Sequence, residues 1–122
     1  MTKPIAVDGD TQIETSSSKH PLDANHSGQW KKVTFTVTKG DKVSVNGKLV
    51  ELGATASWTY VGGANGNTQV GPFSDSATLT ASTTKLKDKS RDVLVDGDQA
   101  TGSVDSNNKI VVSASQQKLT TD

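Results

Sequence analysis

The chain of 122 residues has no cysteine, few aromatic residues and no net charge. Without cysteine it can form no disulfide, thiolate nucleophile or sulfur-ligated zinc site. Thirteen basic residues balance thirteen acidic ones, which argues against a nucleic-acid partner bound through a basic face. No apolar run approaches the length of about 18 residues that a membrane-spanning helix requires.

The N-terminal stretch from Met1 to Asp8 lacks the apolar segment of a signal peptide. We therefore expect synthesis in the cytoplasm and, if the protein leaves the cell, export by a route without a cleaved signal. The length suits a single domain, residues 1–122, with a core of modest size.

Serine and threonine are abundant, with 14 and 16 residues respectively. Disordered chains combine low hydrophobicity with high net charge, and this chain has no net charge. The segment Val33 to Thr38 alternates strictly between apolar residues and threonine, which predicts a strand. The composition predicts an all-β protein with little or no helix.

A short phrase, in which a β-branched run ends in a tight turn, occurs three times. Asp-Gly or Asn-Gly after such a run predicts a hairpin, because a type I′ turn needs positive φ at both central residues. The expected turn residues are Asp8 and Gly9, Asn46 and Gly47, and Asp96 and Gly97. These copies predict three β-hairpin pseudo-repeats around residues 5–10, 43–52 and 93–100.

Four further elements follow from local composition. The composition predicts a polar loop at residues 11–29 and a turn at Lys39-Gly40-Asp41. Residues 81–91 are the one segment that we expect to form a helical turn. The polar tail, residues 113–122, either frays or adds an edge strand.

His20 and His26 are the two histidines, six positions apart in the polar loop. Imidazole is a good ligand for zinc or iron, and a closed structural site needs about four ligands. A metal site would take these two histidines and a further ligand such as Asp8 or Asp23. The alternative is a pair of solvated loop histidines.

The acidic residues near the turns have two interpretations. Asp8, Asp10, Asp96 and Asp98 could form a carboxylate site, but their spacing is too short for a calcium loop. A role in the turns accounts for all four. Neither histidine lies in a pattern typical of a catalytic base, so we expect no enzyme activity.

Trp30, Trp58 and Tyr60 are either a stacking platform for carbohydrate or part of the core. In a chain with so few aromatic residues, the core is the better interpretation. The basic run from Lys85 to Arg91 is a solvated loop or a contact to the acidic rim of a partner.

The repeated phrase resembles the hairpins of PAAR and PAAR-like proteins, the spike tips of contractile injection systems and phage-tail-like particles. That family repeats a Val-x-Val-Asn-Gly-Lys hairpin. Residues 43–50 match it closely, residues 93–100 less closely and residues 5–10 least. The preceding Gly40-Asp41 is similar to the Gly-Asp that the family places before its hairpins.

The resemblance implies a small cone of pseudo-threefold symmetry. Such a cone is a structural, non-enzymatic part of the baseplate: it caps the trimeric β-helical spike protein and meets the target membrane first. The resemblance also implies assembly at the particle tip, with effector cargo as a possible further partner. In many members three histidines and a cysteine hold a metal at the apex. The chain lacks that cysteine and the Pro-Ala-Ala-Arg motif, and Leu49 to Leu52 follow the second phrase.

An alternative is a β-sandwich module that binds carbohydrate or mediates adhesion. Thr-rich alternation and short strands at regular intervals are typical of such modules as well. A third interpretation is another fibre or decoration protein of a phage tail.

Overall fold

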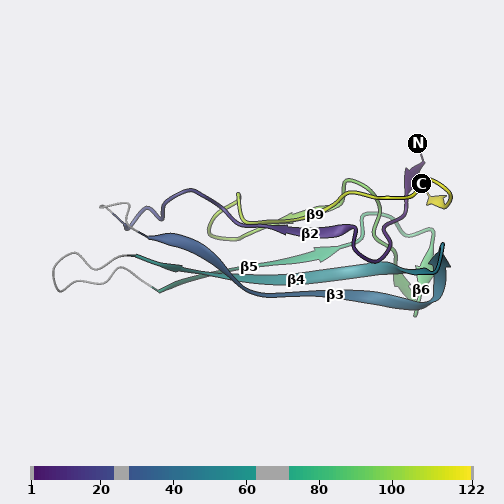
Figure 1. Cartoon of the computed structure of the whole chain (residues 1–122), viewed down its shortest axis with the longest axis horizontal. Coiled ribbons are helices and arrows are strands. Elements are labelled where there is room, and N and C mark those ends of the chain that lie inside the picture. Colours follow the sequence, from purple (N-terminus) through teal and green to yellow (C-terminus); the bar gives the residue numbers. More distant parts are fainter. Residues whose placement is uncertain (1, 24–27, 63–71, 122) are drawn as a thin grey trace.

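The structure, a computed structural model, describes residues 2–23, 28–62 and 72–121. These residues form ten strands and no helix, so the predicted all-β class is confirmed. None of them forms a helix long and apolar enough to cross a membrane. The molecule is elongated, and both termini lie at the same end (Figure 1).

The larger sheet is an antiparallel meander of β3 (Gln29–Val45), β4 (Lys48–Val61) and β5 (Phe73–Thr80). Its strands form because apolar and hydroxyl-bearing residues alternate, and this alternation places successive side chains on opposite faces. In β5, Asp75, Ala77 and Leu79 are buried and the residues between them are exposed.

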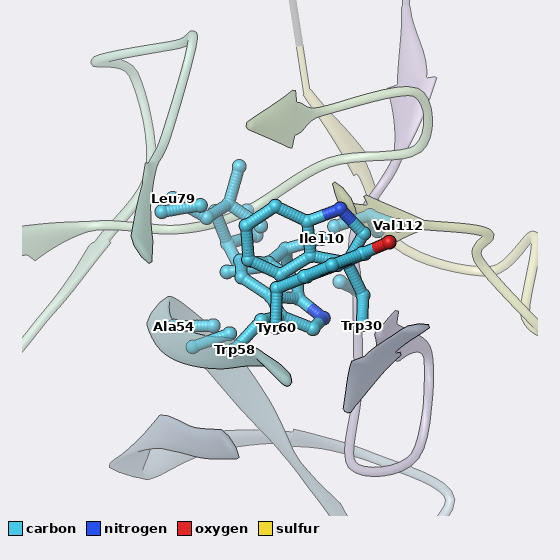
Figure 2. Close-up of a cluster of buried hydrophobic side chains, with 11 residues drawn as sticks. Trp30, Ala54, Trp58, Tyr60, Leu79, Ile110 and Val112 are labelled. Carbon is cyan, nitrogen blue, oxygen red and sulfur yellow. The ribbon is translucent and has the colours of Figure 1, made fainter. Parts of the chain in front are cut away.

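The smaller sheet has the order β2 (Thr11–Glu14), β9 (Lys109–Val112) and β8 (Gln99–Thr101). It contacts the larger sheet through β4 and β5, so the body of the molecule has two layers. The main core lies between them and is shown in Figure 2. It contains Trp30, Ala54, Trp58, Tyr60, Leu79, Ile110 and Val112.

Two short pairs lie at the end of the molecule that carries both termini (Figure 1). β1 (Lys3–Pro4) pairs with β10 (Thr120–Thr121), so the C-terminal tail adds an edge strand. β6 (Lys87–Asp88) and β7 (Arg91–Asp92) form a small hairpin.

Three expectations about local elements were wrong. Residues 81–91 contain the β6–β7 hairpin in place of a helical turn, because Lys89 and Ser90 adopt positive φ. Lys39-Gly40-Asp41 lies within β3, where a shift in register between Lys39 and Ser44 marks a bulge. The expected loop at 11–29 includes β2, which is stabilised by pairing with β9.

The outer face of the larger sheet carries hydroxyl groups at neighbouring paired positions. Thr36, Thr55 and Thr78 form one row across the three strands. Thr34, Ser57 and Ser76 form the next, in which the hydroxyls of Thr34 and Ser57 are 2.7 Å apart. Cross-strand hydroxyl pairs of this kind stabilise a sheet.

Candidate functional site

Three chain segments form a closed ring of main-chain hydrogen bonds at the end near the termini. The N–H of Ala6 donates to the carbonyl of Leu94 at 2.9 Å, and the N–H of Leu94 donates to the carbonyl of Glu51 at 2.8 Å. The N–H of Glu51 donates back to the carbonyl of Ala6 at 3.0 Å. Each central residue therefore donates to one segment and accepts from the other, which is a pseudo-threefold arrangement.

We call residues 5–7, 50–52 and 93–95 the strand triangle. Its corners are antiparallel contacts between the end of one segment and the start of the next. Ile5 bridges Val95, and Val7 bridges Val50. These two corners carry further main-chain bonds, from Asp96 to Pro4 at 2.8 Å and from Asp8 to Leu49 at 2.9 Å.

The side chains of the strand triangle divide between two clusters because neighbouring residues in a strand point to opposite sides. The central residues Ala6 and Leu94 belong to the main core. The residues on either side of each centre form a second, smaller core, with Val45 added. Its triangle members are Ile5, Val7, Val50, Leu52, Val93 and Val95, all at most 2% exposed.

Two of the three repeated phrases contribute the strand before their turn to the strand triangle, and the middle one contributes the strand after its turn. Residues 5–7 and 93–95 precede their turns, whereas the middle segment, 50–52, follows the Asn46-Gly47 turn. Residues 43–45 lie on β3, which pairs with β4 outside the triangle. The middle segment of the triangle therefore lies within the predicted repeat 43–52, on the strand that follows its turn.

The three turns lie at the expected residues but differ in type. Asn46 (φ 55°) and Gly47 (φ 82°) both adopt positive φ, as a type I′ turn requires. At the other two turns, Gly9 (φ 97°) and Gly97 (φ 89°) have positive φ and the preceding aspartates do not. That pattern belongs to a type II turn. The strands on either side of Gly9 and of Gly97 pair with other segments, so of the three turns only Asn46-Gly47 closes a hairpin, and the expectation of three type I′ hairpins was wrong.

Asp10 and Asp98 occupy equivalent positions after the two type II turns and are nearly buried. A carboxylate oxygen of Asp10 accepts the N–H of Val7 at 2.9 Å, and one of Asp98 accepts the N–H of Val95 at 3.0 Å. Each carboxylate thus fastens a turn to the strand that precedes it. This arrangement supports the turn interpretation of these aspartates over a carboxylate site.

Glu51, the central residue of the middle segment, has a buried carboxylate, and only 1% of the residue is exposed. Burial raises the pKa of Glu51, although the Thr11 hydroxyl opposes this shift by donating to the carboxylate at 2.6 Å. Nearby, Lys39 forms an ion pair with Asp8 at 2.8 Å on the surface. The hydrogen bond from Lys39 to Asp8 raises the pKa of the lysine.

The basic run predicted from the sequence lies on the β6–β7 hairpin and its flank. Asp88 joins this hairpin to β3 by accepting the N–H groups of Lys42 and Val43 at 3.0 and 2.8 Å. The Val43 N–H is the main reason why the pKa of Asp88 falls to about 2. A Cβ at Gly40 would collide with the Asp88 carboxylate, so glycine permits this approach.

The turn of the β6–β7 hairpin holds two non-glycine residues in the left-handed region. Lys89 has φ 52° and Ser90 has φ 62°, the geometry that Asn46 and Gly47 adopt in the other hairpin. Left-handed backbone costs an ordinary L-residue about 1 kcal/mol or more. The hairpin therefore bears strain that an Asn-Gly pair would avoid.

The predicted metal site at His20 and His26 stays a prediction for both residues. His26 lies outside the described residues. The His20 ring stacks on Phe73 at a centroid distance of 3.7 Å, and its Nδ1 accepts the N–H of Leu22 at 3.1 Å. Within the described ranges, no three histidine, cysteine, aspartate or glutamate side chains are grouped as metal ligands would be.

Trp30, Trp58 and Tyr60 lie in the core, at most 4% exposed, so the core interpretation of these aromatic residues is confirmed. Figure 2 shows the three rings packed together. The Tyr60 hydroxyl donates to the buried Asp23 carboxylate at 2.5 Å. Burial, with this hydrogen bond, raises the pKa of Tyr60.

Another buried carboxylate, that of Asp75, connects β5 to the loop before β9. It accepts the N–H groups of Val104 and Asp105 and the side-chain amide of Asn108 at 2.9–3.0 Å. Burial would raise the pKa of Asp75, but these hydrogen bonds outweigh it and lower the pKa. Sequence reasoning missed this role, because partners 29–33 positions apart leave no local signal.

One shallow depression of about 490 Å³ lies along β4 and β5. Its lining includes Ser57, Thr59, Ser74, Ser76 and Ser103. Comparison of the chain with family models, with curated proteins and with solved structures gives no match.

Proposed function

We propose that the protein is a PAAR-like, non-enzymatic spike tip of a contractile injection system or phage-tail-like particle. It caps the trimeric β-helical spike protein at the baseplate hub, sharpens it and helps to puncture the target membrane. It is made in the cytoplasm, assembled at the particle tip and delivered with any effector cargo that the tip carries.

The observation that carries this proposal is the strand triangle. A single chain that caps a trimer meets a symmetry mismatch, because the trimer offers three equivalent surfaces. Ala6, Glu51 and Leu94 bond to one another in a buried ring, so three chain segments surround one axis with similar main-chain geometry at this end. A pseudo-threefold end therefore allows one chain to make three similar contacts.

The elongated two-layer body supports the role of a point. The strand triangle and both termini lie at one end, and β3, β4 and β5 extend away from it (Figure 1). The antiparallel ladders of main-chain bonds hold these long strands side by side. If the strand triangle faces the spike, the sheet of β3, β4 and β5 points outward from it.

Co-expression with the trimeric β-helical spike protein encoded beside the chain tests the proposal. With an affinity tag on the spike protein, we expect the chain to co-purify through gel filtration. The control is the same spike protein without its terminal β-helical turns, which should lose the chain. Elution of the chain apart from the complete spike protein would argue against the proposal.

A second candidate is the carbohydrate-binding sandwich module, which the uncharged hydroxyl rows favour. Thr55 and its neighbours on β3 and β5 each offer a donor and an acceptor to a polyhydroxylated ligand. The buried positions of Trp58 and Tyr60 leave such a face without a stacking ring. Saturable binding to an insoluble glycan, abolished by Thr55→Lys, would favour this candidate.

A further inference from the structure

The end with the strand triangle is surrounded by basic side chains. Lys42, Lys48, Lys87, Lys89, Arg91 and Lys118 are all exposed. Their positions are linked through the second core, because Val43, Leu86 and Leu119 each pack against it. We call these six side chains the basic end.

Most acidic groups near the basic end are already engaged. Asp88 accepts main-chain N–H groups from β3, and Asp92 pairs with Lys87 at 2.6 Å. Asp41 remains exposed beside Lys42. Among the residues that the structure describes, the side chains of Lys42, Lys48 and Lys89 have no ion-pair partner.

The strained β6–β7 turn is the second, independent observation. Asn46-Gly47 shows that the same chain uses the favourable pair for this geometry. In the β6–β7 turn, the corresponding positions are Lys89 and Ser90. Lys89 has left-handed backbone there and its side chain is exposed. Strain of this kind persists where a side chain has a function that the unstrained pair could not supply.

We propose that the basic end is the docking face and that it binds an acidic, threefold-symmetric protein surface, with Lys89 in direct contact. This inference rests on the proposed function, because that function supplies the trimeric partner. Exposed charges that meet an opposite charge steer association and fix orientation, and salt screens them. A trimeric protein is favoured over a membrane because the buried strand triangle arranges three chain segments around one axis at this end, and a membrane has no such symmetry.

Paired variants separate charge from strain. Ser90→Gly relieves strain and keeps Lys89, so we expect a higher thermal midpoint and unchanged affinity for the isolated trimeric β-helical spike protein. Lys89→Asn combined with Ser90→Gly should be at least as stable and bind about tenfold more weakly. A triple variant, Lys42→Glu, Lys48→Glu and Lys89→Glu, should lose about a hundredfold in affinity.

Lys31→Glu with Lys32→Glu, at the opposite end of β3, is the matched charge control and should bind normally. Wild-type affinity should fall as salt rises. If wild-type chain binds the trimer and the triple variant binds equally well, the inference is wrong and the proposed function stands. If wild-type chain does not bind the trimer, the proposed function itself fails.

Vesicles of phosphatidylglycerol test the membrane alternative. We expect the triple variant and wild-type chain to bind them equally weakly at physiological salt. Vesicle binding that depends on the three lysines, together with trimer binding that does not, would overturn the inference.

Discussion

The main-chain N–H of Leu94 donates to the carbonyl oxygen of Glu51 at 2.8 Å, across 43 positions of sequence. This bond joins the third repeated phrase to the strand that follows the second. With the equivalent bonds at Ala6 it closes the strand triangle between the two cores of the molecule. The proposed docking end depends on the integrity of this ring.

Removing the Leu94 side chain should destabilise the protein strongly. The residue is fully buried, and Leu94→Ala leaves a cavity beside the triangle, so we expect a loss of about 2–5 kcal/mol in the free energy of unfolding. Urea denaturation measures it. Val104→Ala, at a residue 51% exposed, is the control and should change stability by no more than about 0.5 kcal/mol. Equal effects at the two positions would contradict the described packing.

The three turn glycines should respond alike to alanine. Gly9, Gly47 and Gly97 all have positive φ, and a Cβ at each would meet open space. Alanine therefore adds backbone strain without a clash, and each substitution should cost about 1 kcal/mol in the free energy of unfolding. Thermal denaturation of the three variants checks this. A neutral result at Gly9 or Gly97 would contradict the type II geometry.

Acid should weaken the attachment of the β6–β7 hairpin to β3. Because the folded-state pKa of Asp88 is lowered to about 2, its contribution to stability is complete above the unfolded-state pKa. That contribution is lost as the pH falls from about 4 towards 2. Asp88→Asn should be less stable at pH 7 and show a shallower loss over this range in urea midpoints. Parallel pH curves for the two proteins would argue against the Asp88 contacts.

Glu51 should have the opposite pH dependence. Burial raises its folded-state pKa, so its contribution to stability is present below the ordinary glutamate pKa of 4.5 and is lost as the pH rises through the folded-state pKa. We expect Glu51→Gln to reduce the decline in stability above pH 4.5. Thermal midpoints between pH 4 and 8 measure the difference, and an unchanged slope would show that Glu51 titrates normally.

The sequence predicted elements that local chemistry determines. Asn46-Gly47 forms its type I′ turn because both residues tolerate positive φ, and the alternation from Val33 onward gives β3. The burial of Trp58 and Tyr60 followed from the scarcity of other large apolar residues. Each of these outcomes depends on a few neighbouring residues.

Elements that depend on distant partners were missed. Nothing in residues 50–52 shows that they, and not 43–45, complete the triangle, because their partners lie near residues 6 and 94. The hairpin at Lys89-Ser90 has no favourable turn pair, and its attachment comes from Asp88 and β3. β2 is short and exists through its pairing with β9. Tertiary contacts decide all three cases.

The stoichiometry of the complex shows whether one pseudo-threefold end caps a whole trimer. Native mass spectrometry of the chain bound to the trimeric β-helical spike protein should give one copy of the chain for each trimer, because one pseudo-threefold end occupies the whole threefold axis. Three copies for each trimer would show that each spike subunit binds a chain separately. That result, or the absence of any complex, would contradict the account.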